Sequence, residues 1–495
     1  MKQLLKCILI LLLFASIIPD IASQNVTISY VSNHYQNHFG WSISGDNNYL
    51  AVSDPRDSIK FYGNGCVHIY KKFGYEWEYI QTLQNNIINP YDYFGHRTFM
   101  KGDYLAVSSI GDGTMGFMSG AVHIFHLENG IWKFIQTLRQ DSVQEKTQFG
   151  ESIFISGQNL FVGAPGYNIY GAVFIYSLQA DTFNLIQKVK CLYNVKFQFA
   201  KSITVSDNFM FVGAPAINMD SIKSAVFIFK RNNTLWEIYD KQNYLITNDD
   251  EYGNLFGVSI SAEKDKLLIG APHANVINEN NEECYFAGKA YYYKNISGIY
   301  SLQKEFNNPE IASHDLFGSH VLIQDSVLFI SAPRDDVDNL DEGTIYVTRF
   351  ENNQWVQKSL DSPEDREIQY FSNSFCSFNW QLFIGTGGNK QVKNKGTIYA
   401  YDVKNIININ DSIPTKEVIS VFPNPADEKF RITISENTSY TLRIYSIDGK
   451  EFYVNSLQGN NEINVSNLND GQYIISVNTK KQTYTEKLVI LHKNK

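Results

Sequence analysis

A chain of 495 residues is too long for one simple hydrophobic core and suits two or three domains or one large repeat array. Aromatic residues make up 14% of the chain and only 12 residues are Pro, which favours packed β-structure over disorder. The formal net charge is −9, and no run of Lys and Arg follows the N-terminus. This balance argues against nucleic acid or an anionic membrane as the partner, because both are bound through a basic surface.

The first residues predict a secretory signal peptide. Two Lys precede an apolar run from Cys7 to Ile18, and small residues follow it. We expect a signal peptide over 1–23 with cleavage after Ser23, and a mature chain without a transmembrane segment. An uncleaved membrane anchor is the alternative, although the apolar run is short for a span.

A repeat organises residues 24–405. A Phe-Gly pair, called here the Phe-Gly anchor, recurs five times, and the altered pairs Phe199-Ala200 and Phe371-Ser372 complete a set of seven. Successive Phe positions are 55, 55, 50, 57, 61 and 54 residues apart, and a period of this length usually decides the whole fold. The five unaltered anchors are Phe39-Gly40, Phe94-Gly95, Phe149-Gly150, Phe256-Gly257 and Phe317-Gly318.

Each repeat reads as four short antiparallel strands. A second strand, such as "LFVGAP" at Leu160, begins 11 residues after the Phe in every repeat, which predicts a hairpin with one tight turn. A third strand follows a small residue, as in "GAVFIY" at Gly171, and a fourth surrounds a large aromatic residue, as in "WKFIQTL" at Trp132. Seven such units predict an all-β, seven-bladed β-propeller, because radial repetition leaves only short, protected sheet edges.

The seventh unit is incomplete. No fourth strand follows "GTIYAYDVKN", while the strand "NVTISYV" at the start of the mature chain belongs to no unit. We therefore predict that this N-terminal strand closes blade seven by pairing with the sheet that contains Tyr399. An open β-solenoid of the same units is the alternative, but it would need a capping unit at each end.

These repeats resemble the bacterial FG-GAP repeat, in the form FG.S....D.L.VGAP followed by G.AYVF and a Trp. The resemblance covers about 25–405 and implies the propeller fold of the integrin α-subunit head. Many copies in that family carry a DxDxDGxxD calcium loop between the first two strands. Here that connection is short in every repeat and has no acidic ladder, so the calcium sites of the family do not carry over and no cofactor is predicted.

The pattern changes after a linker over 406–418. Residues 419–495 hold a Pro-punctuated strand, a hairpin with Asp-Gly at its turn and two further strands, which predict a small β-sandwich. The segments "FPNPADEKF", "IYSIDGKEF" and "LNDGQYIISV" resemble the C-terminal sorting domain of the type IX secretion system of Bacteroidetes. This resemblance implies export to the cell surface or beyond, with the secretion machinery as a partner. An ordinary sandwich domain is the alternative. The residues that carry the match are Pro423, Asn424, Pro425, Asp448, Gly449 and Gly471.

The mature chain keeps four scattered cysteines and no CxxC motif, which predicts buried small residues and no metal site, and leaves one disulfide open. His68 and His123 share a third-strand position that holds Phe or Tyr in the other repeats, and this indicates packing between blades. The cysteines are Cys66, Cys191, Cys284 and Cys376.

The loop "PRDDVDNLDEG" is the only weak candidate for Ca²⁺, since it gathers carboxylate oxygens. Its spacing misses the alternation of known calcium loops, so we favour a solvated loop. Its candidate ligands are Asp335, Asp336, Asp338 and Asp341.

Motifs for catalysis are missing. The chain has no G-x-S-x-G and no HExxH, and its nearest approach to a sialidase-type turn, around Asp112 and Gly113, has the wrong spacing. We therefore predict that the protein is not an enzyme.

The connections between the second and third strands form the predicted ligand face. From the start of strand two to the small residue before strand three they span 15, 15, 11, 14, 21, 15 and 14 residues, whereas the hairpin turns keep one length. Variable loops on a rigid scaffold often carry binding, although loop drift is the alternative. The candidate contacts are Asp54, Arg56, Asp57, Tyr285, Phe286 and Arg334.

The sequence therefore predicts a secreted or cell-surface binding or adhesion module, with a glycan or protein ligand on the variable-loop face. An extracellular polysaccharide-acting hydrolase or lyase, with its residues at the central channel, and a structural surface-layer protein are the alternatives.

Overall fold

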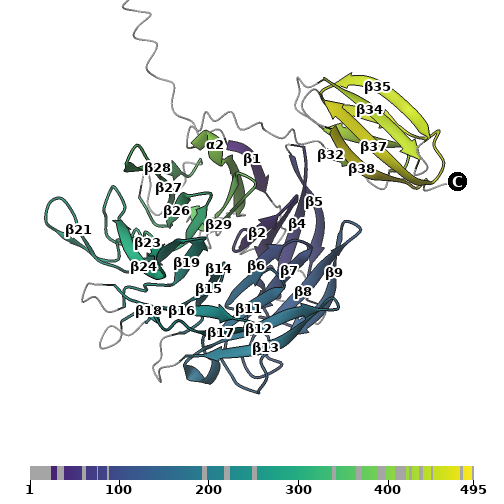
Figure 1. Cartoon of the computed structure of the whole chain (residues 1–495). Coiled ribbons are helices and arrows are strands. Elements are labelled where there is room, and N and C mark those ends of the chain that lie inside the picture. The colour runs from purple at the N-terminus through teal and green to yellow at the C-terminus, as the bar shows by residue number, and fades with distance from the viewer. Residues whose placement is uncertain are drawn as a thin grey trace, which may run out of the picture. The chain divides into compact units, whose positions relative to one another are not determined.

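The computed structural model describes residues 24–29, 38–57, 63–74, 76–85, 89–191, 198–216, 223–247, 253–336, 342–363, 371–386, 396–406, 420–422, 426–433, 439–446, 450–479 and 483–492. In these residues nearly all regular structure is β-strand, as predicted, and the chain forms two compact units (Figure 1). The predicted signal peptide, 1–23, lies outside the described residues.

The larger unit is built from antiparallel sheets with four strands in sequence order, one sheet for each predicted repeat. The first sheet holds β2 (Ile43–Asp46), β3 (Tyr49–Asp54), β4 (Cys66–Phe73) and β5 (Glu76–Leu83). The second holds β6 (Phe94–Lys101), β7 (Tyr104–Ser109), β8 (Ala121–Glu128) and β9 (Ile131–Leu138). The third holds β10 (Ser152–Ser156), β11 (Asn159–Ala164), β12 (Ala172–Gln179) and β13 (Thr182–Lys190), with the short helix η1 (Tyr167–Ile169) between β11 and β12.

The next sheets add small elements. The fourth holds β14 (Ser202–Ser206), β15 (Phe209–Ala214), β16 (Ala225–Asn232) and β17 (Leu235–Ile238), and β18 (Tyr244–Leu245) also pairs with β16. The fifth holds β19 (Ser259–Glu263), β20 (Lys266–Ala271), β23 (Lys289–Ile296) and β24 (Ile299–Phe306), and its long loop forms the hairpin of β21 (Val276–Ile277) and β22 (Glu283–Cys284). The sixth holds β25 (Val321–Gln324), β26 (Val327–Ala332), β27 (Thr344–Glu351) and β28 (Gln354–Asp361).

The seventh sheet joins both ends of the repeat region. It holds β29 (Phe371–Phe378), β30 (Gln381–Thr386) and β31 (Thr397–Asp402), which the short helix α2 (Val403–Ile406) follows. Its fourth strand is β1 (Gln24–Ser29), which pairs antiparallel with β31 so that Thr27 lies opposite Tyr399. The N-terminal strand therefore occupies the place that the incomplete seventh repeat leaves open.

First strands of neighbouring sheets contact each other in the order β2, β6, β10, β14, β19, β25 and β29, and β29 also contacts β2. Side-chain hydrogen bonds cross between the seventh and first sheets: Ser374 Oγ donates to Gly40 O, and Asn379 Nδ2 donates to Asn47 O at 2.7 Å. This arrangement of four-stranded sheets is consistent with a β-propeller.

The second and third strands are apolar runs rather than alternating patterns because both of their faces are covered. In β11, Leu160, Phe161 and Val162 are all fully buried. Leu160 and Val162 pack into a core shared with the second sheet, while Phe161 packs into the core shared with the fourth. Burial of both faces is what a sheet between two other sheets requires.

Several of the Phe-Gly anchors link two sheets through their backbone. The backbone N–H of Phe94 donates to Asn64 O, and that of Phe149 donates to Ser119 O, each in the preceding repeat. The Phe ring instead packs in its own repeat, on the shared third-strand position, with ring centroids 5.2–5.8 Å apart. The ring pairs are Phe39–His68, Phe94–His123, Phe149–Phe174, Phe199–Phe227, Phe256–Tyr291, Phe317–Tyr346 and Phe371–Tyr399.

Glutamine side chains join the outer strands of neighbouring sheets. Gln136 Nε2 donates to the backbone O of Phe183, and the backbone N–H of Phe183 donates to Gln136 Oε1, each at 2.8 Å. Gln81 makes the same two bonds with Trp132, Gln187 with Trp236, and Gln242 with Tyr300. A primary amide offers a donor and an acceptor side by side. It therefore bonds both the backbone N–H and the backbone C=O of one residue in the neighbouring sheet, as a paired strand would.

The smaller unit is a two-sheet sandwich. One sheet has the order β32 (Ser420–Phe422), β33 (Lys429–Thr433), β36 (Asn461–Asn464), and the other has the order β35 (Glu451–Gln458), β34 (Ser439–Ser446), β37 (Gly471–Thr479), β38 (Thr483–Ile490). Both sheets contribute buried residues to one core. Gly471 opens β37, whereas Pro423, Asn424, Pro425, Asp448 and Gly449 lie outside the described residues.

Candidate ligand-binding rim

The second-to-third strand connections share a root of common geometry. In the first, second, third, fifth and sixth repeats, where the structure describes it, the residue seven positions after the start of strand two is buried, and its backbone O accepts the N–H of the glycine that opens strand three. Asp57, Asp112 and Asp335 occupy this root position in the first, second and sixth sheets, and Tyr167 and Ala274 occupy it in the third and fifth. In these five loops the residues up to the root position share one geometry, and the variation in length lies after it.

The root position corrects part of the predicted ligand face. Asp54 and Asp57 are fully buried rather than exposed, so their predicted contact with a ligand on the rim is wrong. Burial raises the pKa of Asp54 to about 7, and the nearby charge of Asp57 adds to this effect. Arg56 is partly buried, whereas Arg334 is exposed.

The long loop of the fifth sheet is an ordered platform. Val276 lies opposite Cys284 in the β21–β22 hairpin, and both side chains pack with Ala287 and Ile311 in a small core of their own. Tyr285 follows the hairpin with 55% of its surface exposed, and its backbone O accepts the N–H of His314 at 2.9 Å. Phe286 is partly buried between the rings of His273 and His314.

A rim pocket of about 440 Å³ opens between this hairpin and the sixth sheet. Carboxylates and carboxamides dominate its lining, together with the Pro309–Ala312 stretch, and its volume falls in the usual range for small-ligand sites. The polar lining side chains are Asn278, Glu279, Asn280, Glu310, Asp335 and Asp336. The structure thus brings two of the weak calcium candidates to this pocket, while Asp338 and Asp341 lie outside the described residues.

Asp335 belongs to a hydrogen-bonded cluster beneath the rim pocket. Asn308 Nδ2 donates to Asp335 Oδ1 at 3.0 Å and to Asp315 Oδ2 at 2.9 Å, so one amide joins both carboxylates. The Tyr346 hydroxyl lies 2.6 Å from Asp335 Oδ2. Burial raises the pKa of Asp335, and it raises that of Asp315 to about 7, with the charge of Asp335 contributing. The hydrogen-bond donors already hold these carboxylates, which leaves Asp335 poorly suited to Ca²⁺.

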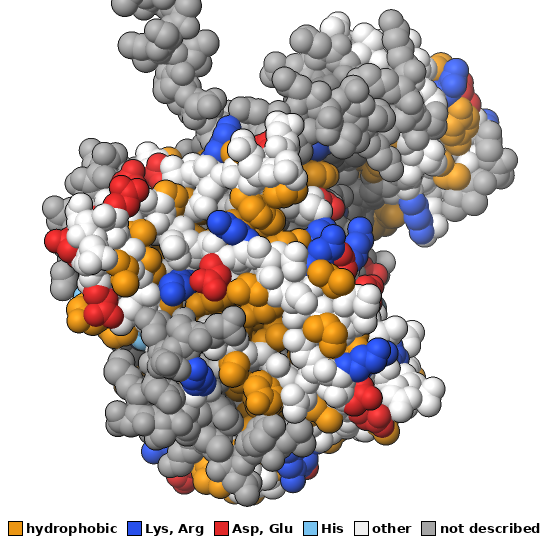
Figure 2. Space-filling view, turned by 60° about the vertical axis from the view of Figure 1, so that its left-hand side comes forward, with side chains coloured by type: hydrophobic (Ala, Val, Ile, Leu, Met, Phe, Trp, Pro, Cys, Tyr) orange, Lys and Arg blue, Asp and Glu red, His pale blue; other side chains and the backbone are white. Residues whose placement is uncertain are grey.

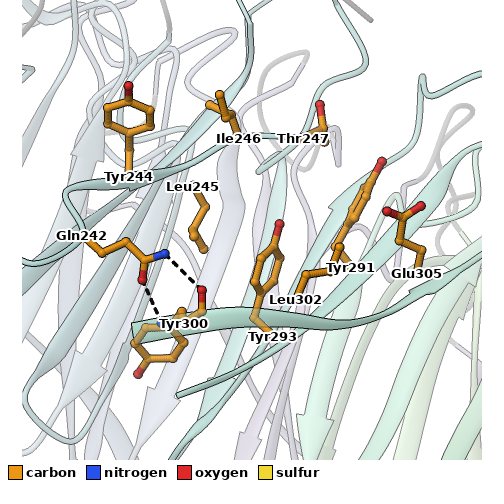
Figure 3. A pocket seen from close by; sticks show the side chains of 10 residues that line it. All are labelled: Gln242, Tyr244, Leu245, Ile246, Thr247, Tyr291, Tyr293, Tyr300, Leu302 and Glu305. Atoms are coloured by element: carbon orange, nitrogen blue, oxygen red, sulfur yellow. Dashed lines mark hydrogen bonds between the residues drawn. The ribbon is translucent and has the colours of Figure 1, made fainter. Parts of the chain in front are cut away.

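A second concavity, of about 290 Å³, lies where the fourth and fifth sheets meet (Figure 3). Tyr244, Tyr291 and Tyr293 direct their hydroxyl groups to the same side of it, and Gln242 holds the backbone of Tyr300 through the glutamine bonds described above. Leu302 and Glu305 complete the wall. Sequence analysis missed this groove because it depends on the separate strand β18, which no repeat predicts.

The four mature cysteines are all free thiols in the structure. None of the helices in the described part of the chain has the length and apolar character needed to span a membrane. On the face drawn in Figure 2, acidic and basic side chains are scattered among apolar ones.

Acid is expected to weaken the native state through His123. Its Nδ1 lies 3.1 Å from Thr137 Oγ1 and its Nε2 lies 3.1 Å from Ser109 Oγ, and burial lowers its pKa to about 4. The unfolded chain, with a pKa of about 6.5, is protonated first. The contribution of neutral His123 to the free energy of unfolding is therefore fully present above pH 6.5 and is lost as the pH falls from 6.5 towards 4.

Substituting His123→Phe tests this, because Phe fills the same position in two other repeats. Between pH 7 and pH 5 the difference in unfolding free energy between variant and wild type should move in favour of the variant by about 2 kcal/mol. Urea unfolding at both pH values measures the change. A difference that stays constant with pH would mean that His123 titrates alike in the folded and unfolded chain.

Residues 420–491 match the family described as the secretion system C-terminal sorting domain. This match confirms the predicted type IX sorting tail and indicates export to the cell surface or the extracellular space by the secretion machinery. It covers the smaller unit alone, so the FG-GAP resemblance of the repeats stays a prediction. No curated protein matches the chain.

Among solved structures, a candidate 6-phosphogluconolactonase from Bacteroides uniformis ATCC 8492 is similar to this chain at 10% identity. The alignment covers 68% of this chain and 89% of that chain, with a TM-score of 0.46. A likeness at this level does not assign an activity.

Proposed function

We propose that this chain is a secreted or surface-displayed binding module on a closed seven-bladed propeller, and that its ligand binds in the rim pocket between blades five and six. The rim pocket itself carries the proposal, because the longest variable loop is folded into a platform with its own small core beside it. Loop drift alone would not require such a core. The sorting domain agrees with a role outside the cell.

The contacts between first strands support the closed ring, because they return from β29 to β2. The pairing of β1 with β31 supports it as well, since it ties the first described strand to the last sheet. Ring closure suits a binding module because it leaves the rim loops on a scaffold with few free edges.

The lining of the rim pocket favours a neutral glycan. Carboxylates and carboxamides such as Glu310 and Asn280 can accept and donate hydrogen bonds to sugar hydroxyl groups. The exposed ring of Tyr285, close by in the same platform, offers an apolar face for a sugar ring. The acidic lining disfavours sialylated or sulfated ligands, because like charges repel at short range.

Binding of the purified full chain to an array of neutral and acidic glycans tests the proposal. Glu310→Gln and Asn280→Ala should each weaken binding of the best neutral glycan at least about tenfold, the free energy of one good polar contact. The fold should survive, because the bonds these residues make within the loop use their backbone N–H groups. Glu128→Gln, in the exposed β8–β9 hairpin, is the matched control.

Unchanged glycan binding in both pocket variants would contradict the assigned pocket, and saturable binding of a protein alone would replace the glycan. No saturable ligand at all would favour the structural surface-layer alternative. The enzyme alternative points to the buried carboxylate of Glu151, directly before strand β10, and it would be favoured by turnover that disappears in Glu151→Gln protein that circular dichroism shows to be folded.

A further inference from the structure

The first sheet gathers three buried side chains of metal-ligating type. Asp57 comes from the loop root, and Cys66 and His68 are the first and third residues of strand β4. One ligand atom from each lies within 4.8 Å of the other two, and all three side chains are buried. In the part of the chain that the structure describes, these residues form the one such group.

The distances fit a tetrahedral ion. Cys66 Sγ lies 3.3 Å from His68 Nε2 and 3.6 Å from Asp57 Oδ2. Bonds of about 2.3 Å to sulfur and about 2.0 Å to nitrogen and oxygen place ligand atoms about 3.3–3.6 Å apart around tetrahedral Zn²⁺. The thiol therefore already lies at these separations from the imidazole and from the carboxylate, and the three ligand atoms all lie within 4.8 Å of one another.

The surroundings orient the histidine for this role. His68 Nδ1 lies 2.9 Å from Thr82 Oγ1, a hydrogen-bond distance that leaves Nε2 facing the thiol. A metal-bound imidazole usually bonds its other ring nitrogen to a neighbouring group in this way.

Asp54 provides an independent observation. It is fully buried, and the His38 N–H donates to its Oδ1 at 2.9 Å. Its Oδ2 is also buried, with no hydrogen-bond partner among the described residues. Its charge acts on both Asp57 and Cys66. A second carboxylate buried beside Asp57 is unfavourable in its charged form, and either protonation or a nearby cation relieves this cost.

The second sheet has the same loop without this chemistry. Fifty-five residues along the chain, Ala121 replaces Cys66 and Ser109 replaces Asp54, while His123 keeps the position of His68. Asp112, the counterpart of Asp57, forms a salt bridge of 2.8 Å with Arg139 instead. The second repeat thus compensates its buried carboxylate with an internal cation, and the first repeat combines a thiol, an imidazole and a second carboxylate at the same place.

We propose that Asp57, Cys66 and His68 bind one Zn²⁺ ion, with the carboxylate of Asp54 nearby as a further negative charge that favours a cation. A mixed sulfur, nitrogen and oxygen donor set suits Zn²⁺, and softer or harder ions fit it less well. The ion would hold the loop root to β4 in the first repeat. Because the site is closed to solvent, it would be filled as the chain folds.

The test uses the full chain purified from cells grown with added Zn²⁺, and its metal content is measured by inductively coupled plasma mass spectrometry. We expect about one zinc per chain. With Co²⁺ in place of Zn²⁺, we expect the thiolate-to-cobalt absorption band in the near ultraviolet and the visible bands of tetrahedral Co²⁺. Cys66→Ala and His68→Phe should abolish both signals, and His123→Phe should keep them.

The two substitutions copy residues that other repeats carry at the same positions, so the fold should tolerate them, and circular dichroism checks this. A metal-free wild type after growth with added zinc would overturn the proposal, as would Cys66→Ala protein that retains the ion. If a variant fails to fold, the cobalt spectrum of the wild type still decides, because without a bound thiolate the charge-transfer band is absent.

Discussion

Glu151→Gln is expected to lower the free energy of unfolding by about 3 kcal/mol, the usual cost of removing one partner from a buried ion pair. Glu151 is 3% exposed and follows the third Phe-Gly anchor, where the chain enters the innermost strand of its sheet. Urea unfolding at neutral pH measures the loss.

The size of this effect comes from two cations and one imidazole around Glu151. Lys201 Nζ lies 2.8 Å from Glu151 Oε1, Arg97 Nη2 lies 3.6 Å from the same oxygen, and His96 Nε2 lies 3.3 Å from Oε2. Burial alone would raise the pKa of Glu151, but the bond to His96 and the charge of Lys201 hold it well below its usual range. A glutamine would leave the ammonium of Lys201 and the guanidinium of Arg97 without the carboxylate that both contact.

Two controls separate this effect from the loss of any surface charge. Glu128 pairs with Lys133 at 2.7 Å on the exposed β8–β9 hairpin, so Glu128→Gln should leave stability unchanged. The double variant Glu151→Gln, Lys201→Met should be more stable than the sum of the two single losses predicts. Strict additivity would mean that the two charges do not interact.

Gly150→Ala is expected to destabilise the native state by about 3 kcal/mol. Gly150 has φ of 96°, a left-handed conformation that costs about 1–2 kcal/mol for a residue with a side chain. A Cβ atom would also lie 2.7 Å from the Cβ of Ser108 and 3.0 Å from Val122 Cγ2, in the neighbouring second sheet. Crowding of this kind costs about 1–3 kcal/mol more.

Gly157→Ala is the matched control for this prediction. Gly157 lies in the β10–β11 turn with φ of 56°, and an added Cβ would meet nothing within 4 Å. Gly157→Ala should therefore lower the free energy of unfolding only by the cost of the left-handed backbone conformation, about 1 kcal/mol. Equal losses for the two variants in urea unfolding would show that the Phe-Gly anchor does not depend on close contact between sheets.

Much of the fold could be predicted from short-range pattern. The constant 11-residue offset predicts the hairpins, and each described pairing of first and second strands has them, as in β10 with β11. The tail could be predicted because its motifs are local. The altered anchors follow the same rule, since Ala200 and Ser372 keep positive φ values of 73° and 76° where the other anchors have Gly.

The candidate site was predicted only in part. The length of the loop before β23 predicted a distinct feature there, and the structure shows a folded hairpin with Tyr285 and Phe286 directly after it. Asn278, Asn280 and Glu310 were missed, because no local pattern tells which side chains of two different loops enclose one pocket.

The sequence by itself determined the repeat, the strand order within each sheet and the export tail, because these depend on residues near one another along the chain. Only the tertiary structure decided which polar residues are buried. Asp54 and Asp57 look like rim contacts in the sequence, yet the hydrogen bonds of the loop root turn them inward, beside Cys66 and His68. The physical reason is that a local pattern places these residues in the loop but does not show which way the folded loop turns their side chains.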